Sequence, residues 1–85
     1  MSRGTVLRMT GVGLITLQLE GGGYMVVTQV GGNPLTVGDL ISGLPESKGR
    51  CVVFNETTRR GVRLSIDAVN ATPRSVDRIM GAGGP

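Results

Sequence analysis

Hydrophobic and polar residues alternate with a period of two along much of this chain. In residues 14–20 and 62–67 every second residue is aliphatic, and most residues between them are polar or charged. Successive side chains of a β-strand point to opposite faces, so both stretches predict strands with one face in a core, the second extending to residue 69. Shorter apolar runs predict further strands at 5–10, 24–30 and 50–55, and a turn-strand unit at 35–43.

Glycine and proline mark the ends of these strands. The glycine run 21–23 predicts a turn, because only glycine adopts positive φ angles freely, and the strands on either side are expected to pair antiparallel. Gly11 and Gly13 interrupt residues 5–20, which predicts either a hairpin or one long strand broken by a glycine bulge. Residues 44–49 are polar and contain proline and glycine, so they are expected to form a surface loop.

The spacing of the apolar residues changes near the end of the chain, from the period of a strand to that of a helix. Thr72 is suited to cap a helix and Pro73 to occupy its first position, while Gly81 is suited to end it. The apolar residues between them recur at helical spacing, at Val76, Ile79 and Met80. The pattern therefore predicts a short amphipathic helix, followed by a disordered tail at 81–85.

The length of 85 residues is enough for one domain, which is expected to comprise residues 1–80. About five short strands with glycine-rich corners and one terminal helix favour a small, mainly β barrel, because an open sheet of this size leaves unpaired edges. The nearest architectures are a five-stranded oligonucleotide/oligosaccharide-binding (OB) barrel and, as the alternative, an SH3-like barrel.

Aromatic side chains are scarce, since the chain contains only Tyr24 and Phe54 and no tryptophan. The core is therefore expected to consist of aliphatic residues and methionine, with Phe54 buried on the same strand face as Val52. Because such a core is thin, a homo-oligomer that pools several cores is also consistent with the composition.

Basic residues outnumber acidic ones by nine to six, eight of the nine are arginine, and most lie in the second half of the chain. Arg59 and Arg60 occupy a predicted turn and Arg63 lies on the next strand, so three guanidinium groups are expected to stand close enough to hold successive phosphates. The other interpretation of these charges is a solvated hairpin tip. The candidate nucleic-acid-binding residues are Arg59, Arg60, Arg63, Lys48, Arg50 and Tyr24, the last as a single stacking platform.

Catalysis is not expected from this composition. The chain has no histidine, its aspartates are scattered along the sequence, and the single Cys51 lies in an apolar strand, so no cofactor or metal site is predicted. A lone cysteine that cannot form an internal disulfide favours a reducing compartment, and we expect a cytoplasmic protein. No signal peptide and no segment long enough to span a membrane are apparent.

Four motifs in this order resemble the S-one RNA-binding repeat, an OB-type barrel. They are Gly4-Thr5-Val6 opening a strand, Gly13 before an apolar strand, Val37-Gly38-Asp39-Leu40, and Arg60-Gly61-Val62-Arg63-Leu64-Ser65-Ile66. The resemblance covers residues 4–67 and implies binding of RNA or single-stranded nucleic acid. The family usually places aromatic residues and a histidine on its ligand face, whereas Leu14 and Ile15 stand here where a phenylalanine is expected.

These observations lead to two functional hypotheses. The first is a small basic β-barrel that binds single-stranded nucleic acid or RNA through an arginine-rich hairpin, with weak sequence preference because phosphate contacts dominate. The second is a protein–protein adaptor or homo-oligomeric assembly module that uses a sheet edge or the apolar side of the terminal helix.

Overall fold

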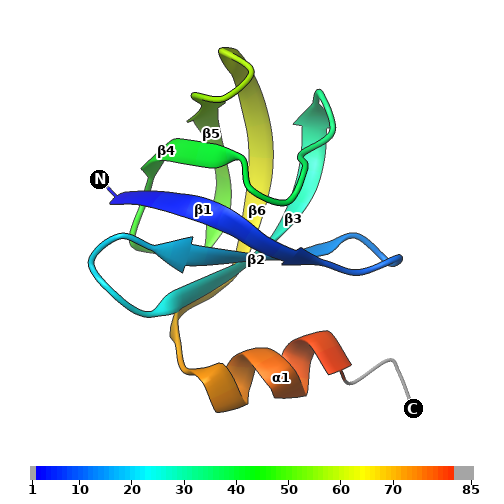
Figure 1. The fold of residues 1–85 in the computed structure, drawn as a ribbon, viewed down its shortest axis with the longest axis vertical. Coiled ribbons are helices and arrows are strands. Elements are labelled where there is room, and N and C mark those ends of the chain that lie inside the picture. The colour runs from blue at the N-terminus through cyan, green and yellow to red at the C-terminus, as the bar shows by residue number, and fades with distance from the viewer. Residues whose placement is uncertain (1, 82–85) are drawn as a thin grey trace.

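Antiparallel pairing of six strands closes the sheet of this protein into a barrel, with one helix beneath it (Figure 1). The computed structural model describes residues 2–81. The elements are β1 (Ser2–Met9), β2 (Leu14–Leu19), β3 (Tyr24–Gly32), β4 (Leu40–Leu44), β5 (Gly49–Asn55), β6 (Arg60–Ala71) and α1 (Pro73–Gly81). The predicted mainly β barrel with a short C-terminal helix is confirmed.

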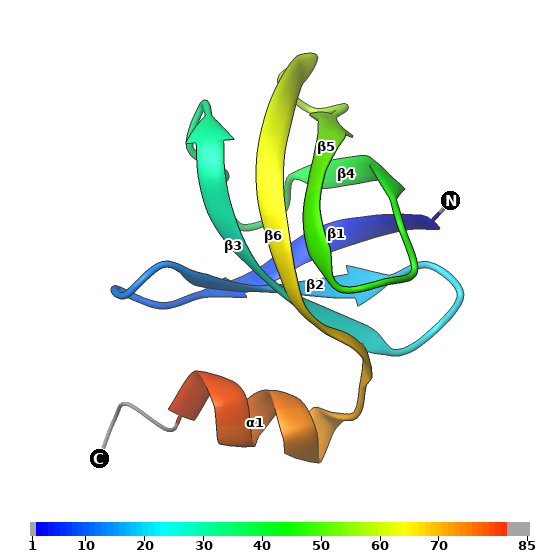
Figure 2. The same cartoon turned by 180° about the vertical axis from the view of Figure 1, so that it is seen from behind.

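The strands follow the order β1-β2-β3-β6-β5-β4 around the barrel, and β4 returns to pair with β1. Figure 2 shows β3, β6 and β5 side by side, so that they form one continuous sheet surface. The seam between β4 and β5 is short, because only Ile41 with Asn55 and Ser42 with Phe54 are paired across it. Most of β5 therefore has a strand partner on its β6 side alone.

The strand count is six rather than five because residues 5–20 form a hairpin. A turn at Thr10–Gly13 separates β1 from β2, with Gly13 at a positive φ of 93°. The Thr10 hydroxyl accepts a hydrogen bond from the amide of Leu14 at 3.1 Å and so fixes the first residue of β2. Of the two alternatives for this segment, the structure selects the hairpin.

Aliphatic side chains and one methionine fill the barrel, as the composition predicts. The fully buried members of this core include Val6, Ile15, Leu17, Met25, Ile41, Leu44, Val62 and Leu64. The expected burial of Phe54 is wrong, since Phe54 is 43% exposed and Val52 is 72% exposed. The inward-facing residues of β5 are instead Val53 and Asn55. Successive side chains of a β-strand point to opposite faces, so the burial of the Asn55 side chain places that of Phe54 on the outer face of the barrel.

The helix begins as predicted. The Thr72 hydroxyl accepts a hydrogen bond from the Ser75 amide at 3.2 Å, which satisfies an amide of the first turn. Val76 is buried in a second apolar cluster with Val26 and Ala71, against which Ile79 also packs. The predicted apolar side of the helix is thus covered by the protein's own barrel as far as Ile79.

The only helix in residues 2–81 is nine residues long and is too short to cross a bilayer. The disordered tail predicted at 81–85 lies outside the described residues, apart from Gly81, which ends α1.

Candidate functional site

The hairpin between β5 and β6 is anchored by a buried asparagine. Asn55 is 1% exposed, and its amide nitrogen donates a hydrogen bond to the Asp39 carboxylate at 2.9 Å. Its side-chain oxygen accepts hydrogen bonds from the backbone amides of Thr57 and Thr58 at 3.0 and 3.3 Å. One side chain therefore fixes the start of the turn from inside the barrel, as Asn does in local turns.

The outer side of β3, β6 and β5 carries two of the arginine residues predicted to bind a ligand, Arg50 and Arg63. On β5 the outward residues are Arg50, Val52 and Phe54, and in the register with β6 they lie opposite Ser65, Arg63 and Gly61. On β3, Val30 lies at a bulge between Gln29 and Gly31, and Gly31 pairs with Arg63. We call this surface the basic face.

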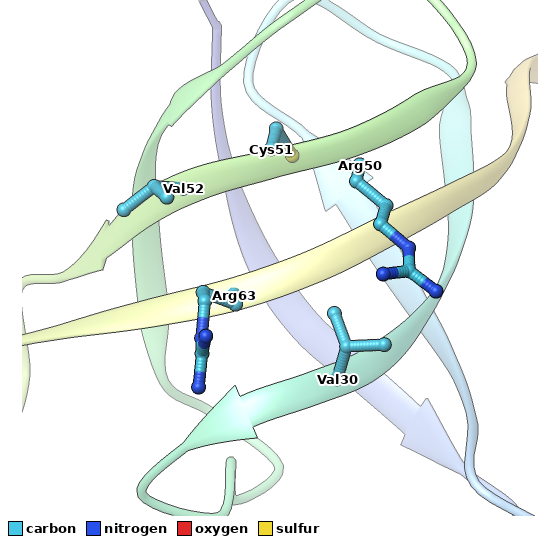
Figure 3. Close-up of a pocket in the computed structure, with 5 residues that line it drawn as sticks. All are labelled: Val30, Arg50, Cys51, Val52 and Arg63. Carbon is cyan, nitrogen blue, oxygen red and sulfur yellow. The ribbon is translucent and has the colours of Figure 1, made fainter.

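A hollow of about 420 Å³ lies on the basic face, lined by Val30, Arg50, Cys51, Val52 and Arg63. Figure 3 shows the guanidinium groups of Arg50 and Arg63 on either side of Val30, one reaching from β5 and the other from β6. Val30 and Val52 are exposed, so the hollow combines an apolar surface with two flanking cations.

Three acidic residues form ion pairs with the arginines of β1, whereas Asp67 lies on the outer side of β6 and is hydrogen-bonded to β3. Glu20 and Glu56 both pair with Arg3, Asp77 pairs with Arg8, and Asp67 accepts a hydrogen bond from Thr28. Within residues 2–81, no ion pair involves Arg50, Arg59, Arg60 or Arg63. The guanidinium groups of the basic face therefore have no direct ion-pair partner in the described part of the chain and can attract an anion.

The five basic residues of the predicted site divide into three groups. Arg50 and Arg63 lie together at the hollow. Arg60 begins β6 opposite Asn55, and Arg59 lies in the preceding turn with a left-handed φ of 58°. Lys48 is exposed in the loop before β5.

Tyr24 lies apart from the arginines. It begins β3 opposite Ala71 and packs, half-buried, against the apolar cluster between α1 and the barrel. The structure therefore does not bring Tyr24 together with Arg50 and Arg63, and the tyrosine is not part of the basic face.

Sequence reasoning missed the aromatic residue that does lie on the basic face. Phe54 is opposite Gly61, which has no side chain to cover the ring, and Ser42 is its neighbour on β4. Alternation within β5 contains no signal for this, because both faces of the strand carry apolar residues; it is the burial of Asn55 that turns Val52 and Phe54 outward. Val30 and Gly31 were also missed, since a bulge changes which side chains face outward.

The described residues offer little reactive chemistry. Burial raises the pKa of the Cys51 thiol, which favours the protonated and less nucleophilic form. Cys51 is half-buried and packs against the barrel core. No group of three metal-ligating side chains comes together within residues 2–81. The arrangement is suited to binding an anion beside an apolar surface.

Comparison of the chain with protein-family models, with curated proteins and with solved structures finds no significant match. The resemblance to the S-one repeat therefore rests on the sequence motifs alone. Any function must be argued from the chemistry of the basic face.

Proposed function

We propose that the basic face binds single-stranded nucleic acid, RNA or DNA, with weak sequence preference. The observation that carries this proposal is the grouping of arginines, which have no ion-pair partner among the described residues, around exposed apolar side chains on one sheet surface. Arg50 and Arg63 flank Val30 and Val52, and Phe54 lies next along β5. Single-stranded nucleic acid presents both of the groups that such a surface attracts, namely phosphates and the faces of unpaired bases.

The arginines supply the phosphate contacts in this proposal. A guanidinium group is always charged and offers a planar set of donors that matches two phosphate oxygens. Arg63 lies opposite Val52, and Arg50 lies two residues from Val52 on β5, which places the two Cα atoms about 8 Å apart. Arg59 and Arg60 add positive charge at the hairpin tip, although the pairing of Arg60 with the inward-facing Asn55 gives Arg60 the opposite parity to Arg63.

Phe54 supplies the base contact. Its ring is partly exposed, and the glycine opposite it leaves one side uncovered. Stacking of a base on an exposed aromatic ring contributes about 1–3 kcal/mol and accepts every base, because every base has a π-face. Phosphate contacts and a single stacking position both favour weak sequence preference. The resemblance of four sequence motifs to the S-one RNA-binding repeat supports RNA as one of the two ligands.

A titration by NMR with a mixed single-stranded oligonucleotide tests the proposal. We expect the largest amide shift changes in β3, β5 and β6, with smaller changes in β1, β2 and α1. If three or four phosphates are contacted, the affinity is expected to fall about 20- to 50-fold between 50 and 200 mM salt, because bound counterions are released on binding. Absence of binding at the lower salt concentration would refute the proposal.

The variant Phe54→Ala is expected to weaken binding about tenfold while leaving the salt dependence unchanged, because it removes stacking but no charge. The measurement is the dissociation constant for the same oligonucleotide at several salt concentrations. Val12→Ala provides the control, since Val12 is 84% exposed on the β1–β2 hairpin. Equal affinities for the two variants would show that Phe54 does not contact a base.

The second candidate function is an assembly or adaptor module. It is favoured by the short seam between β4 and β5, which leaves most of β5 without a partner on one side. Strand edges of this kind accept a further strand from another chain. An assembly module would be oligomeric without any nucleic acid, so light scattering on the titration sample separates the two candidates.

A further inference from the structure

Gly31 occupies a fixed position beside the hollow. Its backbone pairs with Arg63 on β6, and its carbonyl oxygen accepts a hydrogen bond from the Gln29 side chain at 3.2 Å. The same Gln29 amide donates to the carbonyl oxygens of Gly32 and Asn33, and its oxygen accepts from the amide of Leu35. The end of β3 is thereby held from two sides, so the absent side chain of Gly31 leaves a notch at a defined place.

The Arg63 guanidinium occupies this notch. A Cβ atom added to Gly31 would lie 2.6 Å from both Nε and Nη2 of Arg63 and 2.9 Å from Cζ. Real Cβ atoms do not approach other atoms this closely, so any side chain at position 31 must displace the guanidinium. Gly31 does not have a positive φ angle, so the backbone conformation does not itself require glycine there.

We infer that Gly31 is a positioning residue for ligand binding, which sets the Arg63 guanidinium at the border of the hollow so that Arg63 and Arg50 hold successive phosphates. This inference rests on the proposed function. A long exposed arginine otherwise samples many rotamers, and holding it in one place lowers the entropy lost on binding. The group bound here is expected to be a phosphate of a nucleic-acid backbone. Two guanidinium groups, each a planar set of hydrogen-bond donors, border a hollow that has no acidic side chain in its lining.

The neighbouring Gly32 has a different role. A Cβ atom there would lie 2.9 Å from the carbonyl oxygen of Gly61, and Gly32 has a positive φ of 92°. Its substitution would strain the backbone of β3 and β6, whereas substitution of Gly31 meets only the far end of a flexible side chain. Gly31→Ala is therefore the variant that tests positioning without a backbone clash.

The experiment is a double-mutant cycle on oligonucleotide binding. We expect Gly31→Ala to weaken binding of a single-stranded oligothymidylate about fivefold to tenfold, with an unchanged salt slope because the charge is retained. Arg63→Ala is expected to weaken binding by at least as much and to reduce the salt slope by about 0.7. In the Arg63→Ala background, Gly31→Ala is expected to have no further effect, which a merely structural change at Gly31 would not produce.

The binding results separate the positioning role of Gly31 from the proposed function of the basic face. If Arg63→Ala weakens binding but Gly31→Ala does not, the positioning role is wrong and the proposed function stands. If neither variant changes binding, the proposed function of this face fails as well. Should Gly31→Ala not fold, Arg63→Lys replaces it, because lysine keeps the charge but loses the planar fork. Wild-type affinity of Arg63→Lys would overturn the inference, and a similar fivefold to tenfold loss would support it.

Discussion

The double variant Arg50→Ala, Arg63→Ala is expected to bind a single-stranded oligonucleotide about 100-fold more weakly than the unaltered protein at low salt. Each arginine contributes charge-assisted hydrogen bonds, and losing one such contact costs about tenfold in affinity. The slope of log affinity against log salt is expected to become less steep by about 1.4, or 0.7 for each phosphate no longer neutralised. Dissociation constants measured at four or more salt concentrations give both quantities.

The matched control is the double variant Arg74→Ala, Arg78→Ala. Both residues are exposed on α1, form no ion pair within residues 2–81, and change the net charge by the same amount. We expect less than a threefold loss for this control, because exposed charges beyond about 10 Å are largely screened. Similar losses in the two double variants would mean that net charge alone, rather than the basic face, determines binding.

The contrast between the two groups of arginines explains why the basic face is available for a ligand. Arg3 and Arg8, both on β1, pair with acidic residues brought close by the fold. The arginines of β5 and β6 have no such partner within residues 2–81, although the hairpin tip includes Glu56. Glu56 instead faces Arg3 across the barrel seam, at 3.9 Å. The fold thus leaves the arginines of β5 and β6 without direct ion pairs within residues 2–81, although Asp67 lies on the same outer side of β6, where it accepts a hydrogen bond from Thr28.

The barrel was predictable from sequence because its strands carry local signals. Alternation in residues 62–67 and the glycine run at 21–23 predict β6 and the turn before β3, and both are observed. Thr72 and Pro73 likewise predict the start of α1 correctly. These features depend only on neighbours along the chain, and such patterns are the most reliable sequence signals.

The composition of the basic face was less predictable because it depends on contacts between distant residues. The outward position of Phe54 follows from the burial of Asn55, which in turn depends on Asp39, sixteen residues earlier. The alternation of side chains does not show which face of β5 points into the core, since both faces of that strand contain apolar residues. The notch at Gly31 depends on the register with Arg63, which a bulge shifts by one residue. Neither contact has a signature in the local sequence.

The variant Asn55→Ala is expected to lower the free energy of unfolding by about 3 kcal/mol. It removes the acceptor for the amides of Thr57 and Thr58, and it takes one of two donors from the Asp39 carboxylate. A buried polar group that loses its partner costs about 1–3 kcal/mol, and a charged group costs more. In a domain of this size the change corresponds to a fall in Tm of about 15 °C. Thermal and urea denaturation followed by circular dichroism measure both values.

Asn33→Ala is the matched control for this prediction. Asn33 is exposed, and the one hydrogen bond described for it uses its backbone carbonyl oxygen, which alanine retains. We expect a change below about 0.5 kcal/mol, as for most surface substitutions. If Asn55→Ala were no more destabilising than Asn33→Ala, the Asp39–Asn55 contact would not stabilise the barrel. A large difference would instead show that the parity of β5, and with it the outward position of Phe54, is enforced by a buried polar contact rather than by hydrophobic alternation.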